Sequence, residues 1–169
     1  MIAETERLRI EEFTPEMAQA VHENSLDEDN RRFLPDEVFE TPGEAAETVD
    51  FLMSCYGGQE GPFVYPVLLK DGTVIGHVQA VPLEGGGWEA GYHIAKRYAR
   101  NGYATEALRA FLPVVMKNLG IREIRGICAG DNAASRRVME KCGFVLDREA
   151  FGWYKGEQKM ICFFTFRLS

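Results

Sequence analysis

Hydrophobic and polar residues alternate near the start of the chain, and this alternation predicts the first strand. Between Thr5 and Phe13, the apolar residues Leu8 and Ile10 are separated by charged residues, which is the period-2 pattern of a half-buried strand. The period then changes to that of a helix. Thr14 is a good N-cap and Pro15 suits the first helical position, so a short helix is expected to begin there.

A polar, acidic connection and a second helix follow. Residues 24–40 contain six Asp or Glu residues around a Phe-Leu-Pro sequence, and this composition predicts an irregular or briefly helical loop of the kind that often carries specificity. Thr41 is followed three residues later by Glu44, which is a capping-box pattern. The second helix should begin there and end near Gly57.

The middle of the chain has the pattern of three consecutive strands. Residues 63–69 and 74–81 are apolar and rich in β-branched residues, and the Asp71-Gly72 pair between them is a strong hairpin signal. A run of three glycines makes the next turn. Residues 88–95 then read as a third strand of an antiparallel meander.

The segment RNGYATEALRAFL, residues 100–112, predicts a helix whose N-terminus is open to a ligand. Its apolar residues recur at helical spacing directly after a polar turn. The first N–H groups of a helix lack intrahelical acceptors, and the small residues Gly102 and Ala104 would let an anion such as phosphate approach them. The same residues would also suit an ordinary packed helix. Pro113 is expected to kink this helix.

The last third of the chain predicts a strand, a helix and a closing hairpin. The strand over residues 121–128 follows a helix, so it can lie parallel to the strand at 88–95. Asp131 or Asn132 should cap the next helix. Residues 144–151 and 159–168 read as a hairpin, with Gly152, Trp153, Tyr154 and Gly156 in its loop and the two aromatic side chains packed in the hairpin.

Composition limits the classes of protein to consider. The 169 residues are 46% hydrophobic, which suits one domain over residues 1–169 with a single sizeable core. No apolar run reaches the roughly 20 residues that span a bilayer, and the N-terminal sequence lacks the pattern of a signal peptide. We therefore expect a cytoplasmic protein that does not associate with membranes.

Charge and cysteine spacing exclude two kinds of site. The net charge of -7 argues against a nucleic-acid partner and favours a cationic or neutral substrate. The four cysteines are widely spaced and do not cluster with histidines, so no metal site is expected and buried thiols are the default interpretation.

Two motifs, RNGYATEAL from Arg100 and NAASRRVMEKCGF from Asn132, together resemble the GNAT superfamily of N-acetyltransferases, and within it the RimJ/RimL-type branch. The likeness runs through nearly the whole chain, from TERLRI at Thr5 through GYHI at Gly91. It implies an α/β (α+β) fold with a mixed, mostly antiparallel central sheet flanked by helices. In that fold, two parallel strands around 92–95 and 127–130 splay apart at the cofactor site.

The resemblance also implies acetyl-CoA as cofactor and an amine as second substrate, with the pyrophosphate of the cofactor held by main-chain N–H groups at the start of the central helix. The cofactor-binding residues that it implies are Tyr92, His93, Ile94, Arg100, Asn101, Gly102, Tyr103, Ala104, Thr105, Asn132, Ser135 and Arg137.

Two positions depart from the family pattern. The phosphate loop usually begins with Gln or Arg three residues before its glycine, but here that position is Ala99 and the arginine comes one place later. Met139 stands where many members carry a tyrosine that protonates the departing thiolate. Ser135 is then the available hydroxyl near the thiol end, although Asn132 and Ser135 could equally serve only as helix caps.

The expected activity is transfer of an acetyl group from acetyl-CoA to a primary amine by direct attack. Only a neutral amine attacks, so a base must take its proton. Glu89 is the first candidate and His93 the second, with Ser135 as the third catalytic candidate, although Glu89 could also be a plain exposed strand carboxylate. The alternative is a sensor that binds acetyl-CoA without turnover. The sequence leaves open the acceptor, a protein N-terminus or a small molecule, and whether the chain forms a homodimer.

Overall fold

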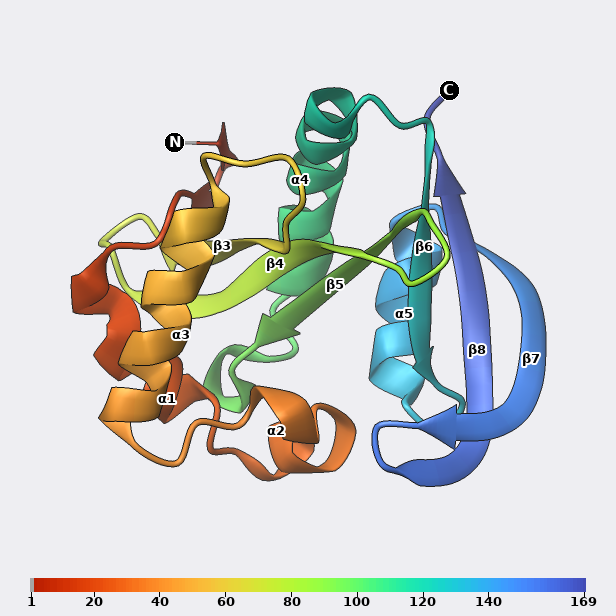
Figure 1. The fold of residues 1–169 in the computed structure, drawn as a ribbon, viewed down its shortest axis with the longest axis horizontal. Coiled ribbons are helices and arrows are strands. Elements are labelled where there is room, and N and C mark those ends of the chain that lie inside the picture. Colours follow the sequence, from red (N-terminus) through yellow and green to blue (C-terminus); the bar gives the residue numbers. More distant parts are fainter. Residues whose placement is uncertain (1) are drawn as a thin grey trace.

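One mixed sheet runs through the whole molecule (Figure 1). The computed structural model describes residues 2–169, and its eight strands lie in the order β1-β2-β3-β4-β5-β6-β8-β7. The strands are β1 Ala3–Glu4, β2 Leu8–Ile10, β3 Phe63–Leu69, β4 Val74–Pro82, β5 Trp88–Ile94, β6 Glu123–Ala129, β7 Val145–Tyr154 and β8 Glu157–Arg167. The α-helices are α1 Ala18–Asn24, α2 Glu28–Phe33, α3 Pro42–Cys55, α4 Tyr103–Leu119 and α5 Ala133–Lys141, with 3-10 turns at Pro15–Met17, Pro35–Glu37 and Lys96–Tyr98. The predicted fold class is confirmed.

Helices pack on both faces of the sheet because neighbouring strand residues point to opposite sides. Val64 of β3 joins a small core with residues of α1 and α3, whereas the next residue, Tyr65, packs edge-on against Phe111 of α4 with ring centroids 5.8 Å apart. The larger core lies on the α4 side, where the fully buried Phe111 is one of its largest side chains. None of the helices in residues 2–169 has the length and apolar character needed to cross a membrane.

The central helix α4 begins and ends at glycines in the left-handed region. Gly102 precedes it with φ 79° and Gly120 follows it with φ 68°. The sequence predicted the first of these glycines at the start of the helix. The helix includes Pro113 and continues beyond it to Leu119.

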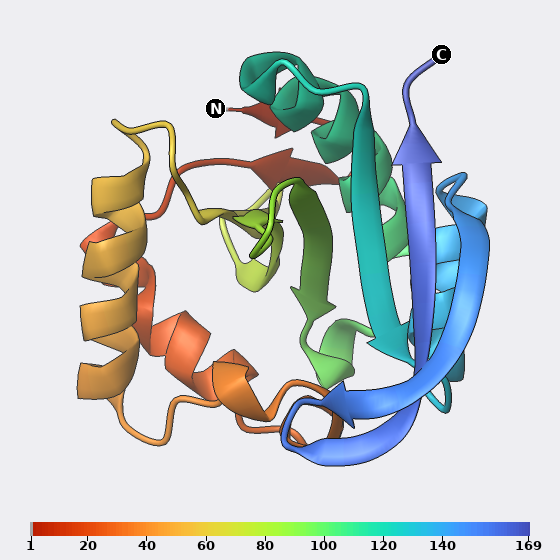
Figure 2. The same ribbon diagram turned by 45° about the vertical axis from the view of Figure 1, so that its right-hand side comes forward.

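The parallel strands β5 and β6 separate soon after they meet. Among the described residues, one register pair joins them, Glu89 to Arg125, while every other neighbouring pair of strands in the sheet is antiparallel. Figure 2 shows the two strands diverging toward their C-terminal ends, above α2 and the tip of the β7–β8 hairpin. The expected splayed pair is thus present.

The first strand predicted between Thr5 and Phe13 is present with Leu8 and Ile10 buried, but it is shorter, because β2 covers only Leu8–Ile10. The Thr5 N–H donates to the Leu8 carbonyl at 2.9 Å, so the chain reverses and pairs β1 with β2. The Thr5 hydroxyl donates to Glu106 of α4 at 2.5 Å. This contact joins the turn to a helix that is distant in the sequence, so the alternation of polar and apolar residues could not indicate it. At Thr14 the helix begins as predicted, but the threonine side chain makes no capping hydrogen bond.

The predicted loop of the last hairpin is wrong. Residues Gly152–Tyr154 belong to β7, and the turn consists of Lys155 with φ 50° and Gly156 with φ 87°. Two consecutive positive φ values give a tight turn whose twist suits a hairpin. Lysine is an unusual residue for the left-handed region, so the sequence carried no Asn-Gly signal at this turn.

Candidate functional site

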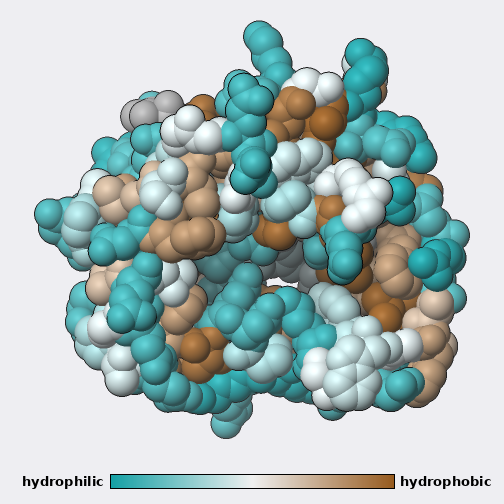
Figure 3. Space-filling view, viewed as in Figure 1, coloured by the Kyte–Doolittle hydropathy of each residue, from teal (hydrophilic) through white to brown (hydrophobic). Residues whose placement is uncertain are grey.

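A cleft of about 550 Å³ opens where β5 and β6 separate. The space-filling view shows the molecule hollowed near its middle (Figure 3). The cleft lies between the N-terminus of α4 and the start of α5 at one end, and α2 and the β7–β8 turn at the other. All the predicted site residues line it except Asn101, whose side-chain amide donates instead to the carbonyls of Tyr98 and Ala99 at 3.0 and 3.2 Å.

The α4 end of the cleft has the geometry of an anion site. The first bond of the helix runs from the Glu106 N–H to the Gly102 carbonyl at 3.1 Å. The main-chain N–H groups of the first turn therefore have no acceptor within the helix, and they lie at the positive end of the helix dipole. Gly102 lines the cleft at this point, carries no side chain, and has a φ of 79° that glycine adopts without strain. Three basic residues line this end: Arg100, Arg137 and Lys141.

The start of α5 supplies a capped helix end and a buried hydroxyl. Asn132 Oδ1 accepts a hydrogen bond from the Ser135 N–H at 3.2 Å, so the capping interpretation holds in this structure. Ser135 is buried, and it lines the cleft together with Tyr92 of β5. Burial raises the pKa of Tyr92 to about 12, against the opposing influence of the Ser135 hydroxyl. The two hydroxyl groups therefore lie close together, and a role of Ser135 toward a cofactor stays a prediction.

Glu89 lies at the other end of the cleft, near the point where the strands part. The register between β4 and β5 runs unbroken from Gly76–Ile94 to Pro82–Trp88, so Glu89, Gly91 and His93 share one face of β5. Burial raises the pKa of Glu89 to about 7, Lys155 opposes the rise, and the charge of Glu37 adds to it. A carboxyl group that gains and loses its proton near neutral pH suits general base catalysis.

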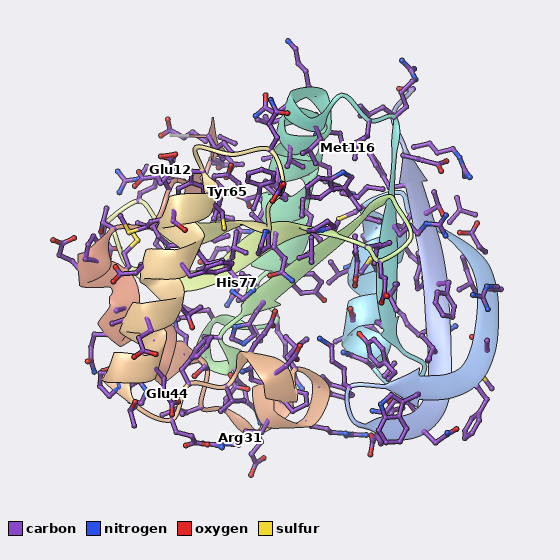
Figure 4. All side chains as sticks on the ribbon, viewed as in Figure 1. Glu12, Arg31, Glu44, Tyr65, His77 and Met116 are labelled. Atoms are coloured by element: carbon purple, nitrogen blue, oxygen red, sulfur yellow. The ribbon has the colours of Figure 1, made fainter. Side chains whose placement is uncertain are left out.

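The second candidate base, His93, faces an acidic partner. Its Nε2 lies 3.8 Å from Oδ2 of Asp27, the N-cap of α2. The pKa of Asp27 lies well below its usual range, first because of His93 and further because main-chain N–H groups donate to this carboxylate. The ring of His77, labelled in Figure 4, lies 5.8 Å from the ring of His93 between centroids and is tilted by 48° to it, and burial lowers the pKa of His77 to about 3.

The raised pKa of Glu89 should make protein stability depend on pH. In the folded protein the pKa is about 7 rather than 4.5, so folding favours the protonated form. Stability from this group is therefore lost as pH rises from about 4.5 to 7. Relative to wild type, Glu89→Gln should gain about 1 to 3 kcal/mol in free energy of unfolding between pH 5 and pH 8. Urea denaturation at both pH values measures this, and an equal difference at the two would contradict it.

Sequence reasoning missed or misplaced several residues of the cleft, and four of them matter most at its α2 end. Asn30 and Glu37 come from the acidic connection, which the sequence marked as a region that can carry specificity without singling out a residue. Lys155 comes from the unrecognised hairpin turn. Tyr154, expected to pack in the hairpin, lines the cleft and donates its hydroxyl hydrogen to the Ile127 carbonyl at 3.4 Å, while Trp153 is 69% exposed.

Comparison with known proteins agrees with this geometry. Residues 7–145 match the family model described as the acetyltransferase (GNAT) domain. An uncharacterised N-acetyltransferase, YnaD of Bacillus subtilis, is 33% identical over 149 residues, which covers 87% of this chain and 83% of that protein. A GNAT-family acetyltransferase from Bacillus anthracis has a TM-score of 0.84 at 27% identity, over 99% of this chain and 98% of that one.

A RimL ribosomal-protein acetyltransferase bound to coenzyme A has the same fold. Its TM-score is also 0.84, over 99% of this chain and 97% of that one, although the sequences are only 16% identical. The Gly102 turn, the splayed strands and the family match lead to one conclusion. The chain belongs to the GNAT family of acetyltransferases and is an acyltransferase of the kind that uses acetyl-CoA.

Proposed function

We propose that this protein transfers the acetyl group of acetyl-CoA directly to a primary amine, with Glu89 as the general base. The observation that carries the proposal is a carboxyl group whose pKa is about 7, held in the same cleft as the open N-terminus of α4. A non-catalytic sensor would need the helix end but no such group. The relative from Bacillus subtilis is also named an N-acetyltransferase.

The cleft residues fit the cofactor from end to end. The pyrophosphate would lie against the N–H groups of residues 100–104, where Gly102 provides close access. The pantetheine arm would run between β5 and β6, whose edges are unpaired beyond Glu89 and Arg125 within the described chain. Unpaired strand edges offer main-chain donors and acceptors to an extended arm that carries amide groups.

The chemical step needs a proton acceptor and a place for negative charge. Acetyl-CoA supplies a thioester, whose acyl carbon the neutral amine attacks while the carbon–sulfur bond breaks. Glu89, directly or through water, takes the proton of the amine. A main-chain N–H near Tyr92–Ile94 donates to the acyl oxygen as it gains charge. Met139 provides no acid at the sulfur, and we assign the leaving thiolate to the Ser135 hydroxyl, which lines the cleft together with Tyr92.

A panel of primary amines tests the proposal. Purified protein with acetyl-CoA should release free thiol at a rate that depends on the amine and on the enzyme concentration, and mass spectrometry should detect the acetylated amine. Binding of acetyl-CoA with no thiol release for any amine, N-terminal peptides included, would support the sensor instead.

A further inference from the structure

We propose that the acceptor is a small diamine, whose reacting amine lies at Glu89 and whose second, charged ammonium is held by Glu37 and Asn30. The inference rests on the proposed acetyl transfer and narrows its substrate to one chemical class. The acceptor end of the cleft, which lies between α2 and the β7–β8 turn, is lined by several charged side chains, and some of these are neutralised by partners within the protein.

Lys155 and Asp27 are two of the charged residues that have partners within the protein. The Lys155 ammonium lies 3.0 and 2.8 Å from the two carboxylate oxygens of Asp36. Asp27 accepts hydrogen bonds from the main-chain N–H groups of Asn30 at 2.7 Å and Lys96 at 3.1 Å, and its second oxygen also faces His93. Neither residue is therefore free to bind a charged substrate.

Three carboxylates that line the cleft have no lysine or arginine within ion-pair distance in residues 2–169: the exposed Asp29 and the half-buried Glu37 and Glu89. The nearest basic group to Glu37 is His77, whose Nε2 lies 4.0 Å from Oε1. Burial lowers the pKa of His77 to about 3, so this histidine is neutral at pH 7 and supplies no positive charge. Burial also raises the pKa of Glu37, against the weaker effect of Lys155. Two half-buried carboxyl groups thus share one end of the cleft without a cation.

Asn30 independently indicates a hydrogen-bond donor at this end. The residue is only 2% exposed and lines the cleft, yet its Oδ1 accepts no hydrogen bond. Its amide nitrogen donates to the carbonyls of Ser25 at 2.8 Å and Glu37 at 3.1 Å, which fixes which end of the side chain is the oxygen. A buried acceptor without a partner is costly, and an ammonium group carries three donors. We infer that an ammonium bound at the Glu37 carboxylate also donates to this Asn30 oxygen, whose own accessible surface is nearly zero.

The walls of the acceptor end favour a small molecule. Phe33 and Leu34 line it with apolar surface suited to a short methylene chain. Two ion pairs connect its opposite sides: Arg32 to Asp131 at 2.9 Å, and Lys155 to Asp36 at 2.8 Å. We infer that a small diamine enters this space without separating the two pairs more readily than a polypeptide N-terminus does.

The test compares two amines that differ only by the second ammonium, 1,4-diaminobutane and 1-aminobutane. The ratio of their kcat/KM values should favour the diamine in the wild type, and Glu37→Gln should reduce that ratio about 10- to 100-fold, mainly by raising KM for the diamine. Diamines with three and five methylene groups extend the series and give the preferred length.

Glu40→Gln is the matched control. It removes the same charge from the same segment, but Glu40 pairs with Arg31 at 2.6 Å, and Arg31 points away from the molecule (Figure 4). The control should keep the wild-type ratio. Three results would each overturn the diamine assignment while leaving acetyl transfer intact. The wild type could use both amines equally, Glu37→Gln could keep the wild-type ratio of kcat/KM values, or Glu37→Gln and Glu40→Gln could reduce that ratio by the same factor. Absence of thiol release with every amine would instead refute the proposed function itself.

Discussion

Glu89→Gln is expected to lower kcat about 10²- to 10⁴-fold at pH 7 and to leave the affinity for acetyl-CoA unchanged. An alkylamine with a pKa near 10 is only about 0.1% neutral at pH 7, so the enzyme depends on a base. Glutamine keeps the size of the side chain but cannot accept the proton. Steady-state kinetics with the best amine of the panel, together with calorimetric titration of coenzyme A, separates the two effects.

The pH dependence distinguishes a base from a structural residue. Wild-type activity should rise as pH increases through about 7, because the ionised form of Glu89 accumulates there. The deficit of Glu89→Gln should shrink toward pH 9, where more of the amine is already neutral. A loss that is the same at every pH would indicate a structural role. His93→Gln is the control, and the same pH signature there with an active Glu89→Gln would transfer the role to the histidine.

Gly102→Val is expected to weaken binding of coenzyme A about 100-fold or more. The side chain would occupy the approach to the N–H groups at the start of α4, and it would have to adopt a φ of 79°, which β-branched residues avoid. The interactions at risk are charge-assisted hydrogen bonds to the pyrophosphate, each worth about 1.5 to 3 kcal/mol. Calorimetric titration with coenzyme A measures the loss.

The other end of α4 provides the control for this substitution. Gly120 has a φ of 68° and no atom near its Cβ position, so Gly120→Val introduces a similar backbone strain away from the cleft. It should reduce thermal stability and keep the wild-type affinity for coenzyme A. If both variants remain folded and bind coenzyme A as tightly as the wild type, the Gly102 turn is not the pyrophosphate site.

The phosphate end of the site was predictable because it depends on the chain's own backbone. A polar turn, a glycine and a helix pattern occur within a few residues, so Gly102 could be placed from local sequence alone, and the cap of the next helix was narrowed to Asp131 or Asn132, of which the structure has Asn132. The shared face of Glu89 and His93 followed likewise from the period of one strand. These predictions need no knowledge of which distant segments meet.

The acceptor end could not be assembled in this way. Asn30, Glu37 and Tyr154 come from segments that meet only because α2 lies against the β7–β8 turn. Sheet order is equally non-local: β8 lies between β6 and β7, so the last strand of the chain is not at the edge. Periodicity identifies strands and faces, but long-range packing decides which loops share a cavity.

The single register pair between β5 and β6 divides the sheet into two parts that can tilt relative to each other. Strands β1 to β5 form one ladder and β6, β8 and β7 form another, and in the described chain main-chain pairing connects them only at Glu89 and Arg125. Elsewhere they are held together by side chains, many of them packed around α4. The two ladders can therefore tilt against each other without breaking the pairing inside either one. The width of the cleft is accordingly the dimension of this sheet that main-chain hydrogen bonds constrain least.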